Sequence, residues 1–119
     1  MDCRFPKEER LHSKKSIKEL FDKGSSFFLY PFKVFYLPNP HTETNQVLIS
    51  VSKKRIKKAV DRNLIKRRIR EAYRLNKHLL SSQNENKKLI GLVYVSSDLM
   101  GFASIEPQLQ KILRRISAL

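Results

Sequence analysis

Hydrophobic residues recur at two different spacings along the chain, and these spacings separate predicted helices from predicted strands. The stretch "SKKSIKELFDKG" places Ile17, Leu20 and Phe21 on one helical face. Ser13 precedes this face as a candidate N-cap, and Gly24 follows it as a stop. The pattern therefore predicts a short amphipathic helix near the N-terminus.

Two more segments have helical spacing. The longest helix is predicted from about residue 57 to residue 78, and its apolar positions are Ile65, Ile69, Ala72 and Tyr73. A C-terminal helix is predicted with Ser104 as its candidate cap and Pro107 tolerated in its first turn. Its apolar positions are Leu109, Ile112, Leu113 and Ile116.

Three stretches have the composition of strands. The aromatic and branched run at residues 27–37 predicts a strand that begins after Pro31. Residues 46–52 alternate, which predicts a strand with one buried face made of Val47, Ile49 and Val51. We expect these two strands to form a hairpin. Residues 89–96 are nearly all apolar, as in a central strand that is covered on both faces.

The order of these elements is helix, strands, helix, strand and helix, which indicates an α+β fold. We expect a small α/β sandwich in which helices pack on a mixed sheet. The 119 residues suffice for one domain with a single core. Residues 1–9 are expected to form its flexible N-terminus.

Composition narrows the class of protein. The hydrophobic fraction of 40% is too high for general disorder, and no apolar run approaches the roughly 18 residues of a membrane span. The N-terminus is charged from its second residue, so we expect a cytoplasmic protein with no membrane partner. Cys3 is the single cysteine, and the spacing of His12, His41 and His78 fits no zinc site. No metal site is predicted in the protein.

Positive charge is concentrated in one part of the chain. The net charge is +14, and residues 53–74 carry eleven Lys or Arg against Asp61 and Glu71, which is a net +9. A uniformly basic surface would fit a role in solubility alone. A focused surface indicates one binding face for a polyanion.

The predicted long helix arranges its charge as a stripe. At 100° per residue, an arc of roughly 140° beside the apolar face contains Arg62, Asn63, Lys66, Arg67, Arg70, Arg74 and Lys77. Such a stripe is often only a solvated face. Here, however, Arg62, Lys66 and Arg70 are like charges at i,i+4 spacing, which destabilise a free helix and favour an anionic partner. Arginine also suits bidentate phosphate contacts.

The segment before this helix extends the predicted binding face. It places cations at a strand end and at the helix start, namely Lys53, Lys54, Lys57 and Lys58. Free backbone N–H groups in the first turn of a helix add to the attraction for phosphate. The alternative interpretation is a basic linker.

These residues carry a family resemblance. "ISVSKK" followed by "RNLIKRRIREAYR" resembles the signature of the bacterial ribonuclease P protein subunit, and "RLHSKKSIKELFDKGSSFFLYPFKVFYL" is similar to the family's first helix and strand. The resemblance extends from Arg10 to the last helix. It implies a mixed sheet of about four strands, with helices and strands in the order αβββαβα along the chain. This fold is similar to that of the second domain of a ribosomal protein.

The resemblance also implies a binding role for the predicted long helix, which in the family contacts the catalytic RNA. The RNA-binding set becomes Lys53, Lys54, Lys57, Lys58, Arg62, Asn63, Lys66, Arg67, Arg68, Arg70 and Arg74. Two features depart from the family pattern. Leu64 stands where the family has a third motif residue, an arginine, so Arg67 or Arg68 must supply that contact or it is missing. The linker "RIKKAV" is also one residue longer than the usual glycine-containing form.

The family binds the 5′ leader of precursor tRNA in a cleft between the sheet and the first helix. By resemblance this cleft contains Phe21, Lys33 and Phe35, with Ile17 at a position that is aromatic in the family. Aromatic faces over a positive groove stack the bases of single-stranded RNA. The residues alone favour core packing for Phe21 and Phe35, whereas the resemblance favours the cleft.

No catalytic residues are predicted. A protein phosphodiesterase needs paired carboxylates or a His and Lys constellation, and the sequence offers neither pattern. The resemblance implies an endoribonuclease holoenzyme for tRNA 5′ maturation, in which the RNA subunit and its bound Mg²⁺ cleave the substrate. The expected partners are the ribonuclease P RNA and precursor tRNA, with no dedicated protein partner and no cofactor on the protein alone.

Three other functions fit some of these features. A ribosomal or ribosome-assembly protein has similar size and charge, but such proteins often carry long basic tails that this chain lacks. A DNA-binding regulator needs a short helix and tight turn before its recognition helix, and no such pattern precedes residue 57. A standalone nuclease is the third alternative.

Overall fold

The computed structural model describes residues 5–38, 44–80 and 87–119. The helical elements are η1 (Lys7–Glu9), α1 (Lys14–Lys23), α2 (Ala59–Asn76), η2 (Lys77–Leu80) and α3 (Phe102–Ser117). The strands are β1 (Ser25–Leu29), β2 (Phe32–Pro38), β3 (Gln46–Val51) and β4 (Lys88–Tyr94). The α+β class and the order αβββαβα are thereby confirmed.

The strands form a mixed sheet in the order β1-β2-β4-β3. β2 pairs antiparallel with both β1 and β4, whereas β3 pairs parallel with β4. The predicted hairpin between residues 27–37 and residues 46–52 is therefore wrong, because β4 lies between β2 and β3. β4 is apolar on both faces, so it gains most from an interior position, and its predicted central place is confirmed.

The hairpin that does form lies within the aromatic run. Residues 25–29 precede Pro31 as a separate strand, and Leu29 pairs with Phe32 across the turn made by Tyr30 and Pro31. The strand predicted to begin after Pro31 is confirmed as β2, while the pattern of the residues alone did not predict β1 as a separate strand. Pro31 marks the turn because proline has no N–H to donate to a sheet ladder.

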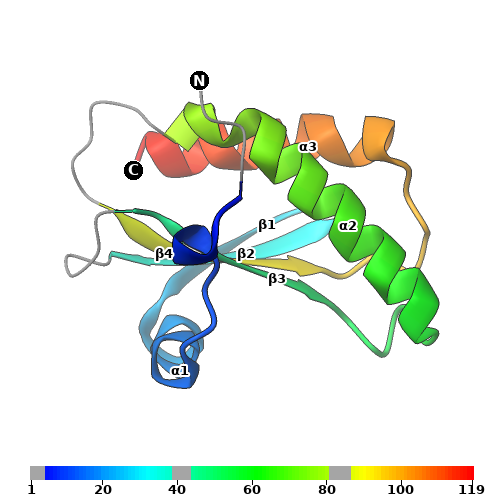
Figure 1. Ribbon diagram of the computed structural model, residues 1–119, viewed down its shortest axis with the longest axis horizontal. Helices are drawn as coiled ribbons and strands as arrows, with labels where there is room; N and C mark the ends of the chain where they lie inside the picture. Colours follow the sequence, from blue (N-terminus) through cyan, green and yellow to red (C-terminus); the bar gives the residue numbers. More distant parts are fainter. Residues whose placement is uncertain (1–4, 39–43, 81–86) are drawn as a thin grey trace.

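Helices cover both faces of the sheet (Figure 1). α2 and α3 lie on one face, and α1 lies on the other, where it packs against β2 and β4. The main core fills the space under α2 and α3, and its fully buried side chains include Phe32, Tyr94, Ile65, Ile69, Ile105, Leu109, Ile112 and Leu113. A smaller cluster under α1 contains Leu11, Leu20 and Leu89.

The residues that begin and end α1 are those predicted from the sequence. The Ser13 hydroxyl accepts a hydrogen bond from the Ser16 N–H at 3.3 Å, so Ser13 is the N-cap. Gly24 ends the helix, and a Cβ there would lie 2.3 Å from the Leu20 carbonyl oxygen and 2.9 Å from that of Tyr36. Only glycine permits this close passage from α1 into β1.

The start of α3 differs from the prediction. Its N-cap is Gly101, so Ser104 lies inside the first turn and is not the cap, and Pro107 lies one turn further in than expected. The reason is the preceding loop, which is fixed from outside α3. The Tyr94 hydroxyl donates to the Asp98 carbonyl and accepts from the Met100 N–H, so the chain is already positioned to enter the helix at residue 102.

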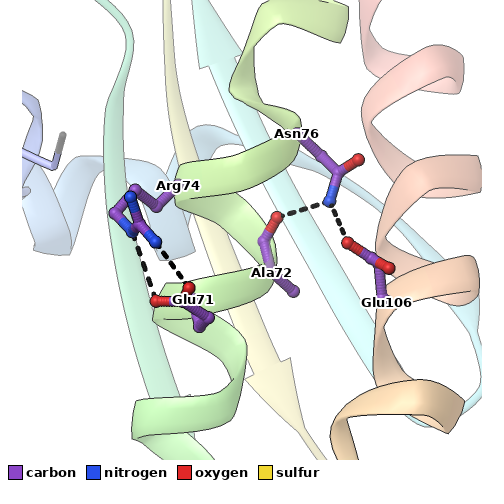
Figure 2. A network of polar contacts seen from close by, with 5 residues as sticks. All are labelled: Glu71, Ala72, Arg74, Asn76 and Glu106. Atoms are coloured by element: carbon purple, nitrogen blue, oxygen red, sulfur yellow. Dashed lines mark hydrogen bonds and ion pairs between the residues drawn. The ribbon is translucent and has the colours of Figure 1, made fainter. Parts of the chain in front are cut away.

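A buried polar network joins α2 to α3 (Figure 2). The Asn76 amide nitrogen donates to the Ala72 carbonyl and to the Glu106 carboxylate, both at 2.8 Å. The Gln110 amide nitrogen in turn donates to the Asn76 side-chain oxygen at 2.9 Å. These bonds fix how the two helices cross, because a buried amide is stable only when its polar atoms are paired.

The N-terminal segment also packs on α2. The Phe5 ring lies 5.1 Å from the Tyr73 ring, and the Glu9 carboxylate forms an ion pair with Lys77 at 3.0 Å. Residues 5–9 thus contact the fold within the segment 1–9, for which the sequence predicts a flexible N-terminus, and residues 1–4 lie outside the described residues. Burial, and then the Glu9 charge, raise the pKa of Tyr73 well above its usual range.

Candidate nucleic-acid interface

α2 divides its circumference between packing and charge. Ile65, Ile69 and Tyr73 are buried against the sheet and α3. The outer face carries cations, and the loop between β3 and α2 carries more. We call this set the basic surface, and its members are Lys53, Lys54, Lys57, Lys58, Asn63, Lys66, Arg67 and Arg70. All are exposed except Lys66, which is half-buried.

No carboxylate among the described residues pairs with Lys66, Arg67 or Arg70. The turns of α2 therefore place three cations side by side without compensation. Such an arrangement is unfavourable in the free protein and becomes favourable when phosphates lie between the charges. The geometry suits a polyanion, in agreement with the charge pattern of the sequence.

Arg62 has a different environment from the rest of the stripe. Its Nη1 atom donates to the Ile56 carbonyl at 3.0 Å and to the Lys57 carbonyl at 2.7 Å. The Ile56 side chain is buried, and its N–H donates to the Ser52 carbonyl at 3.0 Å. Arg62 and Ile56 together hold the basic loop against the start of α2.

Two other predicted cations are also engaged within the chain. The Arg68 Nη1 atom donates to the Met100 carbonyl at 2.8 Å and so fixes the loop before α3. Arg74 forms an exposed ion pair with Glu71 at 2.5 Å (Figure 2). The Arg74 hydrogen bond lowers the pKa of the Glu71 carboxyl. The predicted stripe thus separates into unpaired cations and cations that order neighbouring backbone or side chains.

The residues of the predicted aromatic cleft come from α1, which carries Ile17 and Phe21, and from β2, which carries Lys33 and Phe35. The Phe21 and Phe35 rings meet edge to face with their centroids 4.7 Å apart, and the Lys33 Nζ atom lies 5.3 Å from the Phe35 centroid. Ile17 and Phe35 pack on the cluster that contains Leu20. Phe21 remains 38% exposed and Phe35 is half-buried, so both residues are packed in part and exposed in part.

Gly91 is a part of this cleft that the sequence analysis missed. A Cβ at this position would lie 3.2 Å from the Leu20 side chain and 3.7 Å from the Phe21 ring. Because Gly91 has no side chain, α1 can pack close to β4, and this close packing sets the position of Phe21 relative to Phe35. A glycine within an apolar strand is the one sequence signal that points to such a close approach.

Lys33 and the basic loop lie at the same end of the sheet. Lys33 is the register partner of Val93, and Val93 is the partner of Ser50 near the end of β3. The basic loop begins only a few residues after Ser50. This row of register partners therefore leads from Lys33 to the start of the basic loop.

The described residues contain no group of three or more His, Cys, Asp or Glu side chains that is suited to hold a metal ion. Cys3 and His41 lie outside the described residues. None of the helices in the described ranges has both the length and the apolarity that a membrane crossing demands.

An α/β sandwich with a focused cationic helix and a partly exposed aromatic pair beside a lysine has the features of a nucleic-acid-binding protein. Comparison with known proteins gives the particular family. The family model of ribonuclease P matches residues 5–117. The ribonuclease P protein component of Porphyromonas gingivalis is 41% identical over 116 residues, which cover 93% of this chain and 85% of that protein.

Solved structures agree with this match. The RNase P protein of Staphylococcus aureus superposes with a TM-score of 0.76 at 28% identity and covers 91% of this chain and 94% of its own. The protein from Thermotoga maritima gives a TM-score of 0.74 at 25% identity, with 90% and 96% covered. The chain belongs to the ribonuclease P protein family. It is thus a component of an endonucleolytic tRNA-processing complex and works with the RNase P RNA.

Proposed function

We propose that the protein binds precursor tRNA through two surfaces while it is bound to the ribonuclease P RNA. The basic surface on α2 and its preceding loop contacts RNA phosphates. The cleft of Ile17, Phe21, Lys33 and Phe35 holds the single-stranded 5′ leader. The observation that carries this proposal is the pair of half-packed rings beside Lys33, at the same end of the sheet as the basic loop.

We infer further that phosphodiester cleavage belongs to the RNA subunit and to Mg²⁺ bound through the RNA. Several acidic side chains of the protein are already committed to structural contacts. Glu9 pairs with Lys77, Glu71 pairs with Arg74, and Glu106 accepts a hydrogen bond from Asn76. Metal-assisted hydrolysis by protein groups requires carboxylates that converge on one point. The complex is proposed to act in the cytoplasm.

Reconstitution tests this function. The purified protein is combined with the RNA subunit and precursor tRNA over a series of Mg²⁺ concentrations, and 5′ processing is measured. We expect the protein to restore processing at low Mg²⁺ and to produce no cleavage without the RNA. Cleavage by RNA-free protein that is lost on replacing a named acidic residue would assign the chemistry to the protein instead.

Substrate recognition is tested in the same system. We expect the holoenzyme to bind precursor tRNA more tightly than mature tRNA, because only the precursor has a leader to fill the cleft. Equal affinity for the two forms would refute the leader-binding role and leave the basic surface as the only RNA contact.

A further inference from the structure

Phe28 on β1 is an exposed aromatic residue that the proposed cleft does not include. Its side chain is 60% exposed, more than that of any other phenylalanine in the described residues. The ring belongs to neither apolar cluster, and no other described aromatic ring contacts it. Burial does not explain a phenylalanine at this position.

Strand register places Phe28 next to the cleft. Phe28 is the direct partner of Lys33, which pairs in turn with Val93, and Val93 pairs with Ser50. These four residues, which we call the end row, cross the whole sheet. Lys33 and Phe35 are two residues apart on β2, so the end row lies on the same face as Phe35, the face that carries α1.

The end row continues the aromatic surface in one direction. Phe35 pairs directly with Ser26, so Phe28 is the diagonal neighbour of Phe35 on the adjacent strand. Diagonal neighbours on one face lie roughly 7–8 Å apart, within reach of aromatic side chains. Lys33 is the register partner of Phe28, and its Nζ atom lies 5.3 Å from the Phe35 centroid. One cation is therefore a neighbour of both aromatic residues.

We propose that Phe28 is an additional stacking platform for a base of single-stranded RNA, next to the cleft of Phe21 and Phe35. This inference rests on the proposed leader-binding function and extends it by one base. Single-stranded RNA is bound by successive bases that stack on aromatic side chains along a positively charged groove. The end row supplies the ring and the cation, and its other end leads to the basic loop.

Charge selects RNA over a second copy of the protein as the occupant. The chain carries a net charge of +14, so two copies repel each other, and Lys33 lies beside Phe28 on the face in question. The end row contains no acidic side chain that would attract a basic partner. A phosphate backbone complements this charge.

The first experiment uses the protein alone with short single-stranded RNA that carries 2-aminopurine at successive positions. Stacking quenches the fluorescence of this base. We expect Phe28→Leu to relieve the quenching at one position, whereas Phe28→Tyr retains it. Unchanged quenching at every position in Phe28→Leu would overturn the inference.

The second experiment measures holoenzyme affinity for precursor tRNA with leaders shortened one nucleotide at a time. We expect Phe28→Leu to weaken binding of the full leader about 5-fold and to bind mature tRNA like the wild type. As the leader is lengthened, the affinity of the Phe28→Leu holoenzyme should also stop rising one nucleotide earlier than that of the wild type. Phe35→Ala should instead lose affinity with shorter leaders as well.

The controls separate the inference from the proposed function. Tyr30→Leu removes another exposed ring at the same edge, whose hydroxyl is bonded to Ser96 at 2.8 Å, and should leave leader affinity unchanged. Equal loss in Tyr30→Leu would refute a specific site at Phe28. If Phe35→Ala abolishes the dependence of affinity on the leader and Phe28→Leu preserves it, the inference about Phe28 is refuted and the proposed function is not. Self-association of the free protein that only Phe28→Leu removes would assign this ring to a protein contact and overturn the RNA site.

Discussion

Arg62 and Arg70 lie on the same stripe of α2, but the structure predicts different consequences for their removal. Arg62→Ala deletes one charge and two hydrogen bonds, to the carbonyls of Ile56 and Lys57. Arg70→Ala deletes one charge that no described carboxylate pairs with. Because a hydrogen bond with a charged partner contributes about 1.5–3 kcal/mol when shielded and less when exposed, we expect Arg62→Ala to cost about 2 kcal/mol of stability. For a domain of this size that lowers Tm by roughly 8 °C.

Arg70→Ala should leave stability within about 0.5 kcal/mol of the wild type, since it also relieves like-charge repulsion. Its effect should appear in RNA binding. Each lost phosphate contact reduces the slope of log K against log salt by about 0.7–0.9. Thermal melting and RNA affinity between low and moderate salt therefore separate the two variants.

A double-mutant cycle identifies the cause of any affinity loss in Arg62→Ala. If Arg62 acts by holding the basic loop, its replacement adds little once Lys57→Gln and Lys58→Gln have removed two loop cations. Arg70→Ala should remain additive in that background, because it acts at a separate point. An unchanged Tm for Arg62→Ala, with a salt slope that falls additively as for Arg70→Ala, would refute the positioning role.

Three further predictions concern packing and protonation. Phe35→Ala should cost about 2 kcal/mol of stability by chemical denaturation, roughly half the loss of a fully buried ring, and also weaken leader binding; a loss of 3–5 kcal/mol with equal weakening for both tRNA forms would make Phe35 purely core. Asn76→Ala should cost about 2 kcal/mol, since it leaves Glu106 without its amide donor, and a loss below about 0.5 kcal/mol would show that the network is dispensable. Burial, then the Glu9 charge, raise the pKa of Tyr73 above the ordinary 10.0, so the unfolded chain releases this proton first. Stability should therefore fall as pH rises above 10.0, and Tyr73→Phe should flatten that fall in alkaline denaturation curves.

Local chemistry explains which parts of the fold were predictable. The first helix was bounded correctly because the Ser13 cap and the close approach of Gly24 to the Leu20 carbonyl are contacts between residues near in sequence. The central position of β4 followed from apolar residues on both of its faces. Such features depend on only a few adjacent residues.

Strand neighbours and the start of α3 were not predictable in this way. Alternation at residues 46–52 assigned the correct buried face, but the same pattern fits an antiparallel partner or a parallel one. The cap of α3 depended on Tyr94 and Arg68, which hold the preceding loop from other elements. Ser104 had the right chemistry for a cap and the wrong tertiary context.

The candidate site shows the same division. The sequence placed Arg62, Lys66, Arg67, Arg70 and Arg74 on one stripe of a predicted helix, and the structure contains that helix as α2. It could not show that Arg62 and Arg68 reach backbone carbonyls, because those carbonyls belong to loops whose path depends on the whole fold. The number of cationic residues alone therefore overestimates the number that are available to bind RNA phosphates.

Some cations of α2 position the basic loop, and others remain available for RNA phosphates. Arginine has several donors on a rigid plane, so Arg62 can bind two carbonyls at once and hold a loop whose lysines then face outward. Lys66, Arg67 and Arg70 stay without carboxylate partners in the described residues, and their mutual repulsion destabilises the free protein. RNA bound at this proposed surface would remove that repulsion only where its phosphates lie between those charges. The folded protein and the RNA would then stabilise each other, because any ligand that binds only the folded state adds its binding free energy to that state.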